Sequence, residues 1–164
     1  MSAVLAAIRH LLHEHGVAFR EVHHPPTRTS EESARARGEP LEVGGKAIVL
    51  KVGDTFRLFV LSAARSLDSA AIKRHFAVKK TRFATGEELE SLTGLAPGAV
   101  PPFGRPILDL DLWVDRSIVN NERIAFNAGS LTDSIIMSVR DYLTIARPEV
   151  LDFSRDRVET DGGT

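Results

Sequence analysis

The chain has 164 residues, the length of about one domain, and its 43% hydrophobic and 26% charged residues are typical of a globular protein rather than a disordered one. It contains no cysteine, which excludes a disulfide framework, a thiol nucleophile and a thiolate metal site. Its 21 lysines and arginines against 22 aspartates and glutamates give a net charge of −1, which excludes a globally basic nucleic-acid binder but not a local basic patch.

Nothing in the sequence suggests a membrane protein or several domains. No apolar run reaches the roughly 18 residues of a membrane span. Arg9, His10 and Glu14 interrupt the apolar N-terminal segment, unlike in a signal peptide. We therefore expect a cytoplasmic protein with no membrane partner. Residues 1–153 are expected to form one domain, and residues 154–164 a frayed tail.

The first elements follow from apolar spacing and helix caps. Apolar residues recur every three or four positions over residues 4–12, which predicts an amphipathic helix that ends at Gly16. A short strand is expected over residues 17–22. Thr29 and Glu32 form a predicted capping box for a helix that ends at Gly38.

A predicted hairpin and two further helices come next. Residues 46–51 and 56–61 are strands joined by a turn at Gly53 and Asp54. Ser66 is expected to cap a helix that continues through Phe76. Thr85 and Glu88 form a second capping box, for a helix that ends at Gly94.

The last third begins with a loop and returns to strands. Seven of residues 94–106 are glycine or proline, which predicts a stiff, irregular loop. Residues 108–115 alternate between apolar and polar side chains, as in a half-buried strand. Short strands over residues 124–127 and 134–137 precede a helix capped by Ser138. The predicted fold class is α/β, with a mixed, largely antiparallel sheet.

Two features of the chain could carry chemistry. Prolines and glycines in residues 97–104 can hold backbone N–H groups in fixed positions for a carbonyl oxygen or an oxyanion, or they can simply make a rigid connection. Lys46 follows two glycines and opens an apolar strand, where it could contact a phosphate or an ester, or only protect a sheet edge. Lys51 lies five residues further on and therefore faces the opposite side of a regular strand.

A cluster of basic residues occupies positions 73–82 without an acidic residue among them. Phe76 and Phe83 lie within and beside it. This pattern predicts a phosphate-contacting surface for RNA, although a solvated helix face would give the same pattern. The cluster consists of Lys73, Arg74, Lys79, Lys80 and Arg82.

Other catalytic arrangements have little support. His23 and His24 lack the spacing of metal ligands, so we expect neither a metal nor another cofactor. Ser130 does not lie in the G-x-S-x-G pattern of a nucleophilic serine, and a hydrolase that uses His23 or His24 with Ser130 matches no motif. Asp109 and Asp111 are explained by the outer face of a half-buried strand.

The order of the motifs resembles the YbaK/prolyl-tRNA synthetase-associated editing domain family. A His-Pro-Pro segment at residues 24–26 precedes the Thr29 helix start, and Gly44-Gly45-Lys46 opens a strand. Gly98-Ala-Val-Pro-Pro102, the strand end at Asp115 and Phe126-Asn-Ala-Gly-Ser130 then follow. The resemblance covers roughly residues 1–150. It implies a twisted, barrel-like mixed sheet flanked by helices, and a free-standing hydrolase that deacylates mischarged tRNA, mostly proline tRNA.

The resemblance also implies roles for particular residues. Lys46 matches the essential lysine near the terminal adenosine, and Gly98 matches the glycine whose N–H holds the aminoacyl carbonyl. The implied substrate-binding residues are Thr29, Ala99, Pro101, Pro102, Phe103, Gly129 and Ser130. The implied partners are tRNA and prolyl-tRNA synthetase.

The implied mechanism uses few side chains, because an aminoacyl ester is already activated and water can attack it. Relatives that remove alanine often carry a histidine in the region of residues 126–129, which this sequence lacks. Alanine, serine, threonine and cysteine therefore all remain open as substrates. The alternative is a non-catalytic module of the same fold that binds tRNA or a small aminoacyl or nucleotide ligand.

Overall fold

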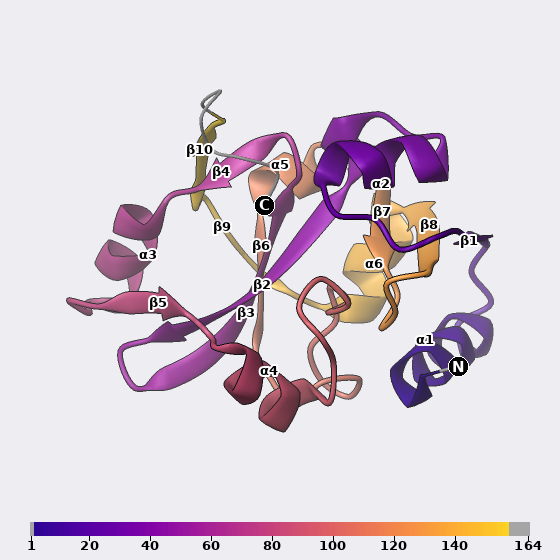
Figure 1. The fold of residues 1–164 in the computed structure, drawn as a ribbon. Helices are drawn as coiled ribbons and strands as arrows, with labels where there is room; N and C mark the ends of the chain where they lie inside the picture. Colours follow the sequence, from indigo (N-terminus) through magenta and orange to yellow (C-terminus); the bar gives the residue numbers. More distant parts are fainter. Residues whose placement is uncertain (1, 158–164) are drawn as a thin grey trace.

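The computed structural model describes residues 2–157, which form an α/β fold with helices packed around three sheets (Figure 1). The helices are α1 (Ala3–Glu14), α2 (Ser30–Arg37), α3 (Ser69–Phe76), α4 (Gly86–Thr93), α5 (Arg116–Val119) and α6 (Val139–Ala146), with a 3-10 turn, η1, at Leu41–Val43. The strands are β1 (Phe19–His23), β2 (Gly45–Val52), β3 (Thr55–Ser62), β4 (Arg65–Leu67), β5 (Thr81–Phe83), β6 (Leu112–Asp115), β7 (Arg123–Asn127), β8 (Asp133–Ser138), β9 (Glu149–Leu151) and β10 (Ser154–Asp156).

The three sheets confirm the predicted mixed, largely antiparallel arrangement. The strand orders are β5-β2-β3-β6-β9, β1-β8-β7 and β10-β4. Only the β3–β6 and β6–β9 pairs are parallel among the strand pairs of residues 2–157. The barrel-like shape implied by the family resemblance is not a closed barrel here, because β5 and β9 remain edges of the five-stranded sheet. An isolated bridge between Gly44 and Ala125 links this sheet to the three-stranded one.

Local capping determines where several helices begin and end. The Thr29 hydroxyl accepts the N–H of Glu32 at the start of α2, and Gly38 ends that helix in the left-handed conformation. The Glu32 carboxylate accepts the N–H of Arg28, one residue before the position predicted for it. α4 has the complete capping box of Thr85 and Glu88. No helix of the described residues is long and apolar enough to cross a membrane.

The larger core lies between α1, the three-stranded sheet and the loop after α4. Leu5, Ile8 and Leu12 place one face of α1 against it, each at most 1% exposed. The Phe103 ring from the loop makes edge contacts with the rings of Phe126 and Tyr142. The Tyr142 hydroxyl donates a hydrogen bond to the carbonyl of Pro102, which fixes the loop against α6.

The start of α3 differs from the prediction. Ser66 lies in β4 rather than at a helix cap, and Asp68 caps α3 by accepting the N–H of Ala71. β4 pairs with β10, which lies far away in the sequence, so the nearby residues gave no sign of this strand. The strand β5 was also missed, and it pairs along the end of β2.

The strand predicted over residues 108–115 is shorter in the structure. Only Leu112–Asp115 form β6, because the N–H groups of Ile107 and Leu108 both bond the carbonyl of Gly104 in a tight turn. Leu108 and Leu110 are buried, as the alternation predicted. A Cβ on Gly104 would lie 2.5 Å from the carbonyl oxygen of Leu110, so this close turn requires a glycine.

The expected frayed tail is wrong for its first residues. Ser154–Asp156 form β10, paired with β4, and the Phe153 side chain is fully buried against Phe59. Asp115 belongs to the polar side of the alternation predicted for residues 108–115, but it is only 3% exposed, because this C-terminal segment covers it. The rest of the predicted tail, residues 158–164, lies outside the described residues.

Candidate active site

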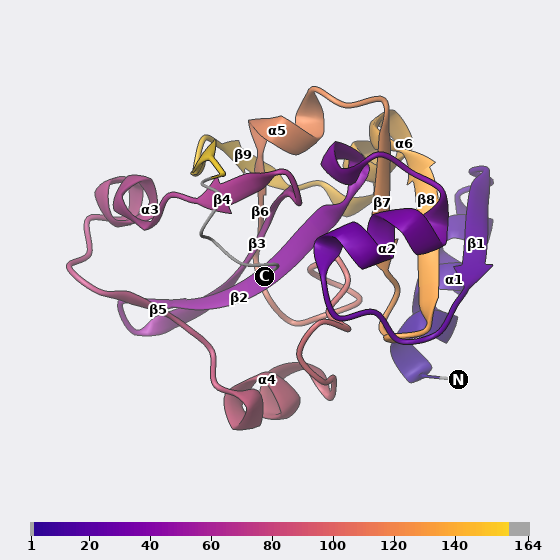
Figure 2. The same cartoon turned by 45° about the horizontal axis from the view of Figure 1, so that its top comes forward.

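A cleft of about 940 Å³ opens along β2, and we call it the β2 cleft. Figures 1 and 2 show β2 with α2, α4 and the loop after α4 beside it, and place α3 and α1 at opposite ends of the molecule. The lining of the β2 cleft comes from the segment 27–37, residues 44–49, the region of β4, the loop at residues 97–100, Asn127, Leu131 and β10. Elements distant in the sequence therefore meet at one site.

The lining of the β2 cleft is cationic. Five basic side chains border it, and no aspartate, glutamate or histidine does among the residues that the structure describes. A negatively charged ligand therefore fits the cleft, and no lining side chain can act as a carboxylate or imidazole base. The five basic residues are Arg28, Arg37, Lys46, Arg155 and Arg157.

Lys46 lies near the start of β2 and borders the cleft. The two glycines before it allow close packing. A Cβ on Gly45 would lie 2.8 Å from the Cδ1 of Ile124, and one on Gly44 would lie 3.1 Å from the Cβ of Ala63. Lys51 borders a different hollow, as the alternation of side chains along a strand predicts.

Gly98 borders the cleft with its backbone in the left-handed region, at a φ of 87°. Its N–H donates no hydrogen bond to any of the described residues. Its carbonyl accepts one from the Nδ2 of Asn127 at 2.7 Å. The glycine therefore offers an unused donor at the edge of a cationic cleft, which is the arrangement needed to hold a carbonyl oxygen.

Two groups of predicted substrate-binding residues occupy different places. Thr29 borders the cleft, although its hydroxyl also caps α2. The residues after Gly98 are buried behind the loop and do not border the cleft, so they shape the loop from within. These residues are Ala99, Pro101, Pro102 and Phe103.

Gly129 and Ser130 also lie away from the cleft lining. A Cβ on Gly129 would lie 2.8 Å from the Cγ1 of Val4, so this glycine allows the turn to pack on α1. The Ser130 hydroxyl donates to the carboxylate of Asp133 at 2.8 Å and accepts the N–H of Thr132. It therefore closes the β7–β8 turn rather than offering a pocket hydroxyl.

No histidine is placed to activate Ser130. His23 contacts Asp133 at 3.0 Å, and this hydrogen bond lowers the pKa of Asp133. His24 is buried, and its Nδ1 donates to the carbonyl of Pro25. The serine hydroxyl thus bonds a carboxylate and not an imidazole, unlike in a serine hydrolase triad. No group of three metal-ligating side chains occurs in residues 2–157.

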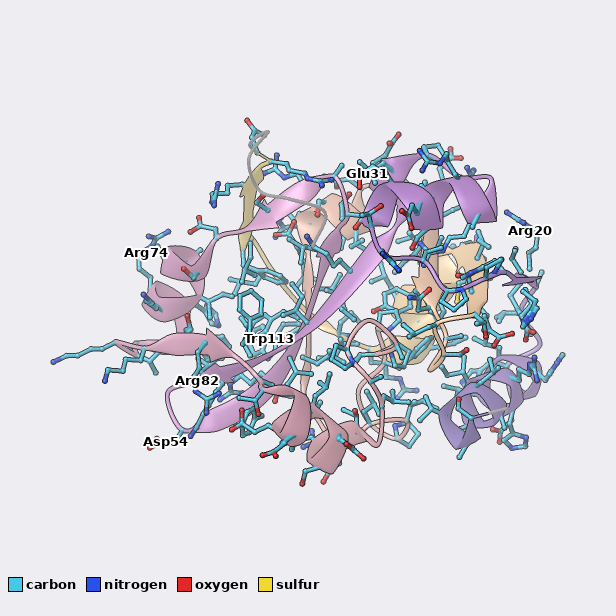
Figure 3. All side chains as sticks on the ribbon, viewed as in Figure 1. Arg20, Glu31, Asp54, Arg74, Arg82 and Trp113 are labelled. Atoms are coloured by element: carbon cyan, nitrogen blue, oxygen red, sulfur yellow. The ribbon has the colours of Figure 1, made fainter. Side chains whose placement is uncertain are left out.

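Four residues of the predicted RNA-binding cluster border a second hollow of about 420 Å³, which we call the hairpin groove. Lys73, Lys79, Lys80 and Arg82 line it with Lys51, and Asp54 adds one acidic side chain to the lining. Arg74 does not line it. Figure 3 shows Arg74 and Arg82 at the end of the molecule opposite Arg20.

Arg82 is already paired within the hairpin groove. Its guanidinium donates two hydrogen bonds to the carboxylate of Glu88, at 2.7 and 2.9 Å. These bonds, together with the N–H of Thr85, lower the pKa of Glu88 to about 2. The lysines therefore carry the charge of this groove that is available to a nucleic acid.

Sequence reasoning missed several cleft residues. Arg37 ends α2, and Arg155 and Arg157 lie in or beside the segment expected to fray, so no local pattern indicated them. Asn127 lies inside the quoted motif of residues 126–130 but was given no role. Its signal was its position at a strand end two residues before Gly129, which sequence alone does not distinguish from a turn.

The model of the aminoacyl-tRNA editing domain family matches residues 24–145. The chain belongs to this family. The match includes Lys46, Gly98 and Asn127, and it ends before the β10 strand that supplies Arg155. Membership confirms the predicted resemblance and the expected class of enzyme, an aminoacyl-tRNA deacylase.

Curated relatives agree with this assignment. The chain is 36% identical over 151 residues to an Escherichia coli K12 protein named multifunctional Ser/Thr-tRNA deacylase ProXp-y, covering 88% of this chain and 89% of the relative. It is also 32% identical over 104 residues to a proline–tRNA ligase of Shouchella clausii, which is 63% of this chain but 18% of the ligase. The similarity to the ligase thus concerns a small part of that enzyme.

Solved structures share the fold. One, described as a candidate trans-editing enzyme for prolyl tRNA synthetase, superposes with a TM-score of 0.81 at 25% identity, over 94% of this chain and 99% of that one. A second, of a hypothetical protein, gives a TM-score of 0.77 at 23% identity, over 90% of this chain and 99% of that one. The second shows likeness of fold alone.

Proposed function

We propose that this chain hydrolyses mischarged tRNA in trans, with proline tRNA carrying a small non-cognate amino acid as the substrate. The β2 cleft carries this proposal, because Lys46 and the unused N–H of Gly98 border one cationic space that suits the phosphates of a tRNA 3′ end. The deacylase name of the Escherichia coli relative supports the reaction. The similarity to proline–tRNA ligases supports the tRNA and makes prolyl-tRNA synthetase the proposed partner.

In the proposed reaction, the Gly98 N–H donates a hydrogen bond to the carbonyl oxygen of the aminoacyl ester. Negative charge develops on this oxygen when a nucleophile attacks, so the hydrogen bond strengthens in the transition state. Loss of one such donor costs about 10²–10³ in rate in other enzymes. Lys46 orients the substrate by its charge against the phosphate or the developing oxyanion.

The nucleophile is water. Its oxygen bonds the carbonyl carbon, and the bond between that carbon and the ribose oxygen breaks. The ribose oxygen takes up the proton that the attacking water loses. Because the described lining offers no carboxylate or imidazole, we assign the positioning of water to the loop backbone or to the neighbouring ribose hydroxyl. The aminoacyl ester is already activated, so its hydrolysis needs little catalytic help beyond a positioned water.

The amino acid that we propose is serine or threonine. The name of the Escherichia coli relative points to these two. The cleft is also rich in hydroxyl groups, with Thr27, Ser30 and Ser66 on its lining. Ser130, which the sequence suggested for this role, is bonded to Asp133 away from the lining. Proline has no side-chain hydroxyl, so hydrogen bonds from the lining to that hydroxyl would favour serine and threonine over the correct residue.

The test is deacylation of proline tRNA charged separately with alanine, serine, threonine, cysteine and proline. We expect rapid release of serine or threonine and no release of proline. Lys46→Ala should abolish most of the release without moving the thermal midpoint. Lys51→Ala is the matched control, since it removes a lysine of the same strand that borders the hairpin groove, and it should keep the rate on a short aminoacylated substrate.

Three results would contradict the proposal in whole or in part. Binding of tRNA without release of any amino acid would favour the non-catalytic binding module. A Lys46→Ala variant that is unstable yet active would show that this lysine is structural. Release of proline at a similar rate would contradict selection by the side-chain hydroxyl while leaving the deacylase activity in place.

A further inference from the structure

Arg37 is a buried cation without a carboxylate partner among the described residues. It is the last residue of α2, it is 8% exposed, and burial lowers its pKa to about 10. Its Nε donates to the hydroxyl of Ser134 at 2.9 Å, and its Nη2 donates to the Oδ1 of Asn127 at 3.0 Å. A buried charge held only by neutral groups is costly, so its placement calls for an explanation.

The hydrogen bonds of Arg37 fix the orientation of the Asn127 amide. A guanidinium can only donate, so the amide oxygen of Asn127 must face Arg37. The amide nitrogen must then face the other way, where it donates to the carbonyl of Gly98 at 2.7 Å. A carbonyl can only accept, so both ends of this amide have unambiguous partners and a flipped amide would break both bonds.

The Asn127 amide holds the peptide plane between Gly98 and Ala99 in place. The Gly98 carbonyl accepts from Asn127, and the Ala99 N–H of the same plane donates to the carbonyl of Ala96 at 3.1 Å. Glycine has the greatest backbone freedom of any residue, so its conformation must be held by such contacts. Holding this plane restricts the φ and ψ rotations of Gly98, and through them the direction of its own N–H, which lies in the preceding plane.

We propose that Asn127, itself oriented by Arg37, is a positioning residue that aims the Gly98 N–H at the ester carbonyl. This inference rests on the proposed deacylase function and adds two residues to it. Asn127 acts through Gly98. Burial of the Arg37 charge costs free energy. It is explained here because a guanidinium can only donate hydrogen bonds, and so fixes which end of the Asn127 amide faces it.

The decisive variant is Asn127→Asp. The carboxylate keeps an acceptor for Arg37 and gains an ion pair, so the fold should remain. The new carboxylate has no N–H to donate to the Gly98 carbonyl, and its negative charge repels that carbonyl oxygen. We expect kcat on proline tRNA charged with serine or threonine to fall by about 10- to 100-fold, which is less than the full loss of an oxyanion donor can cost. KM should stay within about twofold, and the thermal midpoint should not decrease.

Ser134→Ala is the matched control. It removes the hydrogen bonds of the Ser134 hydroxyl with Arg37 and His24 and its longer bond, at 3.3 Å, to the Oδ1 of Asn127. The bonds from Arg37 to Asn127 and from Asn127 to Gly98 stay in place. It should cost some stability, because Ser134 is fully buried, while kcat stays near that of the unmodified protein. Equal loss of kcat in both variants would contradict the proposal, as would a raised KM with unchanged kcat in Asn127→Asp, which would mean direct substrate contact.

A second measurement separates this inference from the proposed function. Amide ¹⁵N relaxation of Gly98 should show an ordered N–H in the unmodified protein and larger motion in Asn127→Asp, with Ser134→Ala unchanged. If the protein deacylates no tRNA, the proposed function fails, and the relaxation data still decide whether Asn127 holds Gly98. Equal order of Gly98 in all three proteins would overturn the positioning role.

Discussion

At the scale of single residues, the site depends on backbone geometry more than on side-chain chemistry. The proposed oxyanion donor is the N–H of Gly98, whose φ of 87° is unfavourable for any residue with a Cβ. The nearest atom to an added Cβ would be the Cδ2 of Leu131, at 3.3 Å. Backbone strain, and not a steric collision, therefore accounts for most of the destabilisation expected from a substitution at Gly98.

We predict that Gly98→Ala lowers kcat by about 10²-fold, since the N–H turns away from the carbonyl when the backbone relaxes. The strain should cost about 1–2 kcal/mol of unfolding free energy. Gly94→Ala is the control, because Gly94 also has a positive φ, of 73°, and an added Cβ there would have no atom within 4 Å. It should lose similar stability in urea unfolding and keep its kcat; equal kcat in both variants would remove Gly98 from the mechanism.

At the scale of elements, one carboxylate fastens the C-terminal strand to the sheet. Asp115 ends β6 and accepts the N–H of Phe153, the hydroxyl of Ser154 and the N–H of Ser117. Burial acts to raise the pKa of Asp115, but these hydrogen bonds outweigh it and lower the pKa. The docked strand β10 then brings Arg155 to the cleft.

We predict that Asp115→Ala destabilises the protein by about 1–3 kcal/mol at pH 7, because the buried Phe153 N–H loses its acceptor. A lowered pKa means that this stabilisation is complete above the unfolded-state pKa of about 3.9 and is lost as the pH falls through the folded-state value. Urea unfolding at pH 7 and pH 3 should show the loss shrinking in acid. Asp109→Ala, at an exposed pair with Arg105, should change little at either pH. A loss that does not shrink in acid would show that the carboxylate charge is not involved.

At the scale of the whole molecule, a net charge of −1 conceals two basic surfaces. Many other arginines are paired with carboxylates, as Arg20 and Arg123 are with Glu39, so their charge is compensated. The β2 cleft and the hairpin groove also collect basic residues, of which Arg157 pairs with Glu31 and Arg82 with Glu88. We propose that the tRNA backbone follows the lysines of the groove while its 3′ end enters the cleft.

We predict that replacing Lys73, Lys79 and Lys80 together by alanine weakens tRNA binding and flattens its salt dependence. Each lost phosphate contact should reduce the slope of log K against log salt by about 0.7–0.9. Arg140→Ala, an exposed cation of α6, is the control and should leave the slope unchanged. An unchanged slope in the triple variant would place the RNA on another surface. Hydrolysis of a short aminoacylated oligonucleotide should be unaffected, because it reaches only the cleft.

The sequence alone determined the local features of this protein. Capping residues set the starts of α2, α4 and α6, apolar spacing set α1, and the order of motifs indicated the family. These features depend on residues within a few positions of one another. Lys46 and Gly98 were identifiable for the same reason, since each lies in a short motif.

Only the tertiary structure decided what lies around those motifs. β4 and β10 exist because they pair with each other across the chain, and Asp115 is buried because a later segment covers it. The buried Arg37, the oriented amide of Asn127 and the carbonyl of Gly98 come from three separate regions. Their hydrogen bonds depend on distances in space, which no local pattern of residues encodes.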